Sequence, residues 1–433
     1  MNLPKILRKS APRSGSIHDR GKIRLLRFPK RDPDEPGGWQ SFWRLGPGMV
    51  TGSANIDPSA VITATVAGAA FSFSLLWVVL LCIPFLLAIF AVTARIGIET
   101  GQGLLDLVRT SYGKRIAVFG AVVAIIVNMA VVVADLMAVS DSLSIILGQP
   151  RMYFVAATAF SVWYILIFRD YRKITRVLVL LSLPLYLYIA AAVITAPSLR
   201  TLLWNALIPH MRATPDYIEG VVALMGSFMT PYIVIWQVSS RSDPKHEPHA
   251  SDSRLATLVT ALLAVSIMVA AGSVLHFSQA VDMTPRQAAE ALRPVVGDWG
   301  TVLFALGIVG SGMVALPVLV ASMCYDLAQA SGWKYGLSEE PWQATRFYAL
   351  ISVAMLLAGV ANFLHVNPTQ ALYWSMILAG ILLVPTLGFI LIISNDRRVM
   401  HTPNTRWQNF WVGAAAGASV SATLAYFWAK VLR

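Results

Sequence analysis

The stretch GSANIDPSAVITATVAGAAF, residues 52–71, decides the fold of this chain. It belongs to an apolar segment, yet it contains Asp57 followed directly by Pro58. Proline removes one helical hydrogen bond, and an aspartate near the centre of a bilayer costs about 2.5 to 3.5 kcal/mol on insertion scales. The stretch therefore predicts an interrupted membrane helix whose acid has a function at that depth.

The composition is that of a polytopic membrane protein built only of helices. Of the 433 residues, 56% are hydrophobic and 13% are charged, with a mean hydropathy of +0.64, whereas soluble domains contain about 25% charged residues. Apolar runs of about 20 residues, the length that crosses a bilayer as a helix, recur along the chain. We expect eleven spans, at residues 45–70, 73–97, 115–146, 152–168, 174–196, 217–239, 254–278, 299–327, 346–364, 369–394 and 408–430.

The basic residues indicate the topology of the chain. A tail at residues 1–44 is rich in Lys and Arg, which predicts a cytoplasmic N-terminus and, with eleven spans, an extracytoplasmic C-terminus. The net charge of +12 then reflects topology and contact with anionic lipid, and we expect no nucleic-acid partner. We expect an integral protein of a bacterial inner membrane; an Arg-rich transit peptide is the alternative interpretation of the tail.

A second interrupted span resembles the first. Residues 217–239 contain MGSFMTPYIVIWQVSS, in which Gly226 precedes Thr230, Pro231 and Tyr232. Matching Gly/Pro-interrupted spans in two halves of a chain predict an inverted-repeat transporter with its binding site at the midplane. We therefore expect repeats at residues 45–196 and 217–395, followed by a loop and an additional helix at 396–433.

The two breaks predict an oxygen-rich site. Carbonyl groups before Pro58 and Pro231, the Asp57 carboxylate and the hydroxyls of Ser59 and Thr230 are ligands that suit a hard cation. The alternative is a proline kink with an acid that reaches toward the interface, but the side chain of Asp57 is too short for this. Tyr232 either donates its phenol to the cavity or packs as a core aromatic residue.

Span three carries a second deep acid. Within IIVNMAVVVADLMAV, Asn128 and Asp135 lie on one face of the helix. A buried aspartate can load and release a proton, so we expect Asp135 on a proton pathway; hydrogen bonding that serves helix packing is the alternative. Gln237 either lines the inner part of the pathway or packs in the core.

These residues resemble the natural resistance-associated macrophage protein (NRAMP) family of proton-coupled divalent metal transporters. The resemblance rests on GPGMVTGSANIDPSA, GAAFSFSLLWVVLL, ARIGIETGQGLLDLVRTSYG, ADLMAV and GSFMTPYIVIWQVSS, and it extends to about residue 395. It implies a leucine-transporter-like fold of the APC superfamily, with five plus five spans in inverted repeats and an eleventh span.

The chain departs from the family's pattern at its ligands. The family's Asp-Pro-Gly-Asn is Asp57-Pro58-Ser59-Ala60 here, its Met-Pro-His is Thr230-Pro231-Tyr232, and its second span-three acid falls on Ala138. Loss of the soft thioether relaxes selection against hard ions, so the resemblance implies an NRAMP-related branch that favours Mg²⁺ or Mn²⁺. The predicted site comprises Asp57, Ser59, the Ala60 backbone, the Ser227 backbone, Thr230 and Tyr232.

Two other functions fit the same residues. A cavity with one carboxylate and several hydroxyls also suits a small organic solute, and a non-transporting sensor would keep the fold without the flux. No phosphate-binding glycine loop, nucleotide domain or nucleophile with an adjacent base appears, so we expect no enzymatic activity. We expect no cofactor besides the cargo ion, protons as the coupling partner, and a monomer in the lipid bilayer.

Overall fold

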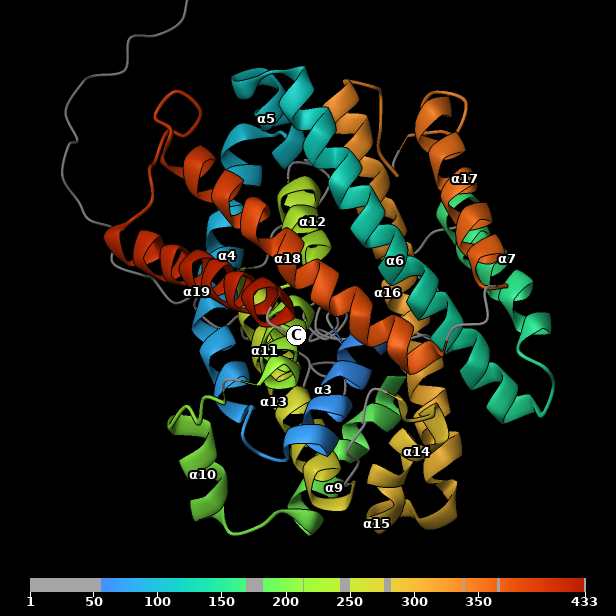
Figure 1. The fold of residues 1–433 in the computed structure, drawn as a ribbon. Helices are drawn as coiled ribbons and strands as arrows, with labels where there is room; N and C mark the ends of the chain where they lie inside the picture. Colours follow the sequence, from blue (N-terminus) through green and yellow to red (C-terminus); the bar gives the residue numbers. More distant parts are fainter. Residues whose placement is uncertain are drawn as a thin grey trace, which may run out of the picture. The chain divides into compact units, whose positions relative to one another are not determined.

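The computed structural model describes residues 56–168, 182–212, 214–241, 250–275, 282–337, 339–363 and 367–431. These residues form helices and connecting loops without strands, which confirms the predicted all-α class (Figure 1). The predicted basic tail and the first half of span one lie outside the described residues. The longer helices are α3 (Pro58–Phe71), α4 (Leu76–Thr100), α6 (Lys114–Leu147), α7 (Met152–Phe168), α9 (Leu187–Thr195), α11 (Pro215–Phe228), α12 (Pro231–Arg241), α13 (Ala250–Val274), α16 (Gly300–Ser331), α17 (Thr345–Ala361), α18 (Pro368–Asn395) and α19 (Arg406–Val431).

Apolar helices occupy all the predicted span positions. Within the described ranges, seven helices are long and apolar enough to cross a membrane, or eight if one bent pair counts as a span. That pair, Leu183–Thr195 and Leu199–Leu207, bends by 115°, and its second part, α10 (Leu199–Leu207), is a helix that we did not predict. Three shorter apolar helices, α3, α7 and α17, coincide with predicted spans one, four and nine.

Proline residues start helices at both predicted breaks. Pro58 is the first residue of α3, and Pro231 is the first residue of α12. The first helical position needs no backbone N–H, and the fixed φ of proline suits it, so a proline that would disrupt a helix interior is well placed there. Span six is consequently two helices, α11 and α12, separated by Met229 and Thr230.

The two broken spans pack in a related manner. Helix α3 of span one packs against α13 of span seven. Helix α12 of span six packs in the corresponding way against α4 of span two. Helices α6 and α16, spans three and eight, pack against each other along much of their length (Figure 1). Backbones approach closely at small residues: a Cβ at Gly68 of α3 would lie 2.5 Å from the Met268 carbonyl oxygen of α13. Spans one and two of the first repeat correspond to spans six and seven of the second, so these two contacts are equivalent, as an inverted repeat requires.

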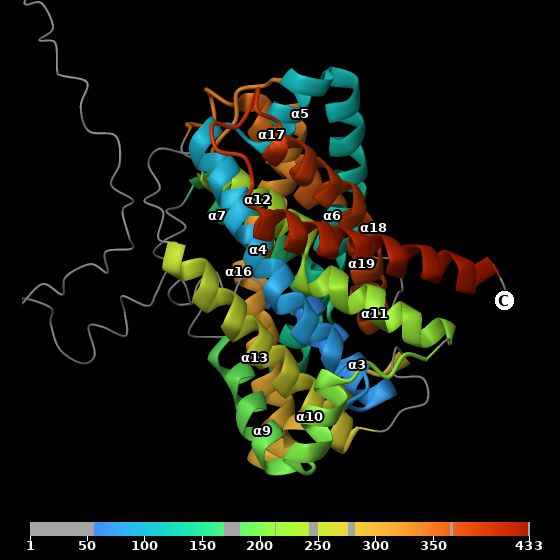
Figure 2. The ribbon, with the colours of Figure 1, turned by 90° about the vertical axis from the view of Figure 1, so that its left-hand side faces the viewer.

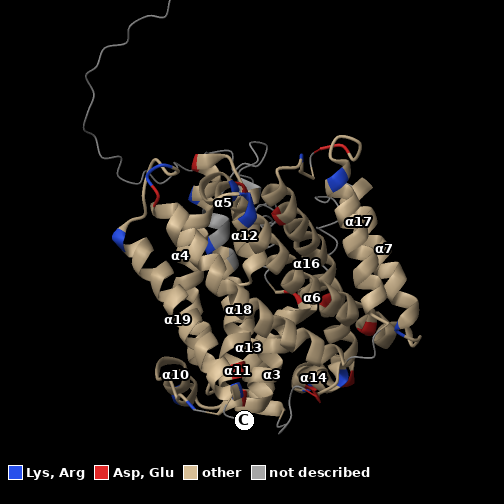
Figure 3. Cartoon of the chain, turned by 45° about the horizontal axis from the view of Figure 1, so that its top comes forward, with Lys and Arg blue, Asp and Glu red and all other residues tan. Residues whose placement is uncertain are grey.

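The charged residues lie mainly at the two ends of the helix bundle (Figure 3). One end carries the short helix α5 (Leu104–Tyr112) and the start of α17; the other carries α10 and α14 (Pro285–Ala289). Between them is a broad band of uncharged residues, interrupted by a few acidic positions near α6 and α16 (Figure 3). The band is what a bilayer-spanning bundle needs, and the acids within it mark candidate functional positions.

An ion pair connects the last helix, α19, to α11, the first half of span six. Helix α19 lies beside α11 and α18 (Figure 2). Near its end, Lys430 Nζ lies 2.6 Å from Glu219 Oε1 of α11. The same ammonium lies over the rings of Trp374 and Tyr426, 5.2 and 5.8 Å from their centroids. The additional helix thus contacts the first half of span six through a partly buried charge.

We expect Glu219→Gln to lower the thermal midpoint of the purified protein more than Glu339→Gln does. The side chain of Glu219 is 10% exposed in its pair with Lys430, whereas that of Glu339 is 34% exposed in its pair with Lys334. Solvent-screened ion pairs contribute little, and breaking a buried pair leaves an uncompensated charge. Thermal unfolding in detergent measures the difference, and equal midpoints for the two variants would contradict it.

Candidate functional site

Asp57 is the centre of the site because it joins the two broken spans. It is 1% exposed and occupies the N-cap of α3, where its Oδ1 accepts a hydrogen bond of 2.7 Å from the Ala60 N–H. Its other carboxylate oxygen, Oδ2, accepts a 3.0 Å hydrogen bond from the Tyr232 hydroxyl in the first turn of α12. Both carboxylate oxygens of Asp57 thus accept a hydrogen bond, one from a backbone N–H in the first turn of α3 and one from the phenol of Tyr232.

A second acid from span three reaches the same turn of α3. The Ser59 hydroxyl donates a 2.6 Å hydrogen bond to Asp135 Oδ1, and both side chains are buried. Asp135 Oδ2 has no hydrogen-bond partner among the described residues. Two carboxyl groups, Asp57 and Asp135, therefore lie on either side of the Pro58–Ser59 step, and an unused oxygen is available for a further ligand.

Two backbone carbonyls at the breaks accept hydrogen bonds within the helices that follow them. The Asp57 carbonyl accepts from the Val61 N–H at 3.2 Å, and the Thr230 carbonyl accepts from the N–H groups of Ile233 and Val234 at 3.1 and 3.2 Å. The two prolines do not leave these carbonyls free, because each proline begins a helix whose first bonds the preceding residue accepts. The carbonyls without intrahelical partners belong instead to the last turn of α11, which includes Ser227.

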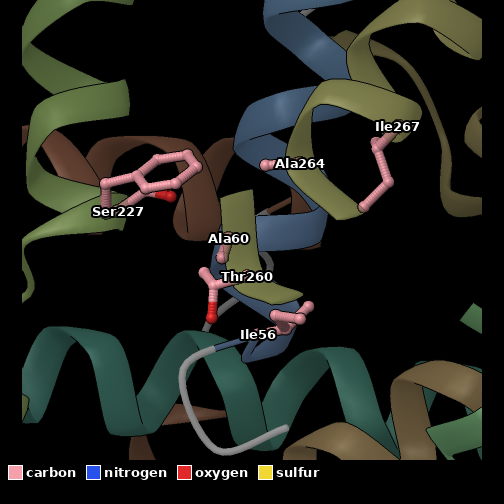
Figure 4. Close-up of a pocket in the computed structure, with 7 residues that line it drawn as sticks. Ile56, Ala60, Ser227, Thr260, Ala264 and Ile267 are labelled. Atoms are coloured by element: carbon pink, nitrogen blue, oxygen red, sulfur yellow. The ribbon is translucent and has the colours of Figure 1, made fainter. Parts of the chain in front are cut away.

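A small pocket lies beside this cluster, between α3, α11 and α13 (Figure 4). It is lined by Ile56, Ala60, Ser227, Phe228, Thr260, Ala264 and Ile267. Two of the predicted positions, Ala60 and Ser227, therefore face one cavity. Thr260 of α13 adds a hydroxyl that we did not predict, because span seven has no break to draw attention to it.

The remaining predicted residues lie away from the Asp57 cluster or only flank it. Thr230 is buried at the break in span six, directly before α12. Asn128 is buried on α6, but seven residues separate it from Asp135, a rise of about 10 Å along a helix. Gln237 is buried in α12, five residues beyond Tyr232. The structure therefore brings together Asp57, Ser59, Asp135 and Tyr232, and sets Asn128 and Gln237 toward the α5 end of the bundle.

The donors at the cluster are oxygen atoms. Asp57 and Asp135 contribute carboxylates, and Ser59, Thr230 and Tyr232 contribute hydroxyls. Across the described part of the chain, no group of three or more His, Cys, Asp or Glu side chains is arranged to hold a metal ion. Such a donor set suits weak, reversible binding of a hard cation that keeps part of its water shell, and does not suit a permanently bound structural metal.

Sequence reasoning missed one deep acid. Asp326 of α16 is fully buried, and neither of its carboxylate oxygens has a hydrogen-bond partner in the part of the chain that the structure describes. We predicted that span eight ends at residue 327 and did not single out Asp326, which directly precedes that end. Helix α16 in fact continues to Ser331 and ends at Gly332, whose φ of 71° is left-handed. That helix-stopping glycine, which follows the stretch YDLAQAS, was the signal available in the sequence.

Comparison with known proteins gives relatives along nearly the whole chain. The profile of the family described as "Natural resistance-associated macrophage protein-like" matches residues 48–429. A protein of Klebsiella pneumoniae (strain 342) named divalent metal cation transporter MntH is 23% identical over 394 residues, which are 88% of this chain and 93% of that protein. The MntH of Granulibacter bethesdensis is 23% identical over 427 residues, 94% of this chain and 93% of its own length.

Solved structures share the fold. A histidine-to-alanine mutant of the Eremococcus coleocola manganese transporter superposes with a TM-score of 0.67 at 18% identity, covering 90% of this chain and 88% of that one. The same transporter in complex with an aromatic bis-isothiourea substituted compound also gives 0.67, at 16% identity, covering 92% and 93%. These transporters have the leucine-transporter-like fold, which confirms the predicted architecture. The match of the family profile to residues 48–429 shows that this chain belongs to the NRAMP family.

Proposed function

We propose that this protein is a secondary active transporter that moves a divalent metal cation, Mg²⁺ or Mn²⁺, across the membrane by alternating access. The observation that carries the proposal is the 3.0 Å hydrogen bond between Asp57 and Tyr232, which joins the two broken spans through a buried carboxylate. A buried acid at a pair of broken helices is the arrangement by which transporters bind an ion near the bilayer midplane. The curated relatives, which are named divalent metal cation transporters, support the same class of cargo.

The donor atoms favour a hard cation. Sulfur and imidazole ligands would select later transition metals, and the cluster of Asp57, Ser59, Asp135, Thr230 and Tyr232 contains neither. Mg²⁺ prefers oxygen ligands and gives up its water reluctantly, so few direct protein ligands suffice for it. Mn²⁺ accepts the same carboxylate and hydroxyl ligands. The buried Met229 is adjacent to Thr230, and its sulfur would join the site only if the break shifted by one residue.

To bind an ion, the carboxylates of Asp57 and Asp135 must release their present hydrogen-bond donors. Tyr232 occupies Asp57 Oδ2, and Ser59 occupies one oxygen of Asp135. An arriving cation would replace these donors, and a proton leaving Asp135 would compensate part of its charge. Rocking of the helices of spans one and six against α6 and α16 would then open the other side. We place the N-terminus in the cytoplasm, so that the α5 end of the bundle is the cytoplasmic end.

Uptake by the purified full-length chain in liposomes tests the proposal. We expect saturable uptake of Mn²⁺ and Mg²⁺ and slower uptake of Ca²⁺, with simultaneous acidification of the liposome interior reported by a pH-sensitive dye. A panel of amino acids and organic acids serves as the alternative cargo. Uptake of an organic solute without any cation flux would overturn the metal assignment, and absence of flux for every compound would favour a sensor.

We expect Tyr232→Phe to increase the stabilisation that the protein gains from a bound cation. The ring is 1% exposed and keeps its packing in this variant, but Asp57 Oδ2 loses its donor. A carboxylate oxygen without a donor is unfavourable in the metal-free protein and directly available to an ion. The shift of the thermal midpoint on adding Mn²⁺ measures this. A shift no larger than that of the unmodified protein would contradict the competition between phenol and ion.

A further inference from the structure

The buried face of α16 that meets α12 carries a line of polar side chains. Ser322, Asp326 and Gln329 follow one another at intervals of four and three residues, which places them on one face of the helix. The Ser322 hydroxyl donates a 3.0 Å hydrogen bond to the backbone carbonyl of Tyr232, the residue that holds Asp57. The line therefore begins next to the Asp57 cluster.

At the α5 end of the bundle, the line of polar side chains ends in a hydrogen-bond network around Gln329, which we call the Gln329 closure. The Gln329 amide donates to Ser239 Oγ at 2.9 Å and accepts from the Leu105 N–H at 3.3 Å. Arg109 Nε donates to the Gln329 carbonyl at 3.0 Å, and its guanidinium pairs with Asp106 at 3.0 Å. These bonds hold α5, α12 and the end of α16 together, so that Gln329 separates Asp326 from the surface.

Tyr335, in the loop after α16, completes this closure. Its hydroxyl donates a hydrogen bond to Asp106 Oδ2. Burial, together with that bond to the carboxylate, raises the pKa of the Tyr335 phenol, so the phenol remains a donor across the physiological range. Tyr335, Asp106 and Arg109 are thus linked by hydrogen bonds and an ion pair at the end of α16.

Asp326 lies between the cluster and the closure. It is one helical turn, a rise of about 6 Å, beyond Ser322, and one turn before Gln329. It is 0% exposed, and neither carboxylate oxygen has a donor among the described residues. Buried polar groups that serve packing are hydrogen-bonded, and a buried charge without a partner is very unfavourable. A structural role therefore does not account for this side chain.

Charged and titratable groups occur on the elements around this half of α16, but none forms an ion pair with Asp326 within the described ranges. They are Asp106 and Arg109 on α5, Lys114, Arg115 and Asp135 on α6, Tyr232 on α12, Arg346 and Tyr348 on α17, Tyr335 after α16, and Cys324 and Tyr325 on α16 itself. Arg109 is committed to Asp106 and the Gln329 carbonyl. No fixed cation among these described groups therefore neutralises the Asp326 carboxylate.

We propose that Asp326 is a proton-binding site on the α5 side of the transport site, which exchanges its proton with the aqueous phase when the Gln329 closure opens. A proton needs only one carboxyl group, whereas a metal ion needs several ligands, which the described residues do not gather here. With the closure intact, Asp326 holds its proton and is neutral. Opening admits water, and the carboxylate releases the proton. The inference rests on the proposed transport function and adds a proton site on span eight.

The experiment compares Asp326→Asn with the unmodified protein in liposomes of varied internal pH. Asn cannot bind a proton, but it has the shape of a neutral aspartic acid, so we expect folding and the Mn²⁺-induced shift of the thermal midpoint to be unchanged. The dependence of Mn²⁺ uptake on internal pH should be lost, and Asp326→Glu should restore it. The matched control is Asp298→Asn, which removes an acid whose side chain is 98% exposed, just before the opposite end of α16.

Infrared spectroscopy gives a second readout that needs no cargo. The carbonyl stretch of a protonated carboxyl group should be present in films of the unmodified protein and reduced in Asp326→Asn, but not in Asp298→Asn. Retention of that band together with unchanged pH dependence in Asp326→Asn would overturn the proton site. If the unmodified protein carries no cation while the infrared band is lost in Asp326→Asn, the transport proposal fails and the proton site stands.

Discussion

Liposomes containing the Asp57→Asn variant are expected to take up no Mn²⁺ above the level of protein-free liposomes. The variant removes one negative charge at the centre of the site and changes little else. At 4 Å and an effective dielectric constant of about 20, two unit charges attract by about 4 kcal/mol, and a divalent ion doubles that attraction. After the cost of dehydration, we expect cation binding to weaken by at least about a hundredfold.

Asparagine is the informative substitution at this position because it keeps the helix start. Asn and Asp are about equally good N-cap residues. The amide oxygen of the substituted side chain would accept from the Ala60 N–H, which now bonds to Asp57 Oδ1 at 2.7 Å. The amide nitrogen would face Tyr232, whose hydroxyl oxygen can accept instead of donating. Folding should therefore survive, and the loss of uptake would report on charge.

A control separates charge from capping. Asn367 is the N-cap of α18, where its Oδ1 accepts from the Thr369 N–H at 3.0 Å. Asn367→Ala removes that cap, which typically costs about 1 kcal/mol, without altering the charge of the site, so we expect uptake to persist. The assignment of Asp57 as the ion's ligand fails if Asp57→Asn takes up Mn²⁺ at the rate of the unmodified protein.

Gly226→Ala should abolish uptake by preventing α11 and α18 from packing. A Cβ at Gly226 would lie 2.1 Å from the Met376 carbonyl oxygen and 2.5 Å from the Gly380 N–H nitrogen. Both are backbone atoms that cannot turn away, so the two helices must separate. Overpacking of this kind costs about 1 to 3 kcal/mol or more, and it displaces the end of α11 that carries Ser227 and leads to Thr230.

Gly388→Ala is the matched control for this substitution. Gly388 lies on α18, the helix against which Gly226 of α11 packs, and a Cβ there would meet no atom within 4 Å. We expect its thermal midpoint and uptake to equal those of the unmodified protein, whereas Gly226→Ala should yield less folded protein in detergent size-exclusion chromatography. Equal behaviour of the two variants would show that the α11–α18 approach is looser than the structure describes.

The two breaks could be predicted from the sequence because their signals are local. Asp57-Pro58 and Thr230-Pro231 mark two breaks, and proline acts on its own backbone whatever surrounds it. The pairing of Ser59 with Asp135 was not predictable, because it depends on how far α6 and α3 approach each other, which no local pattern specifies. The same holds for Thr260, which reaches the pocket from an unbroken span.

Two features of the structure depend on where its helices begin and end. The carbonyls of Asp57 and Thr230 accept hydrogen bonds, because a proline at the start of a helix turns the preceding residue into an acceptor for that helix. We predicted that span eight ends at residue 327, where the apolar run weakens, while α16 continues to Ser331. Hydropathy measures the chemistry of residues, and the end of a helix is determined by its cap.

The N-cap role of Asp57 gives the cargo a mechanical effect. Under the proposed function, the carboxylate whose Oδ1 caps the first turn of α3 also binds the ion, so the ion and the helix start would compete for one side chain. An ion that draws the carboxylate away leaves the Ala60 N–H without its acceptor and loosens that turn, while an empty site tightens it. The stability of the first turn of α3 would thus depend on whether the site is occupied.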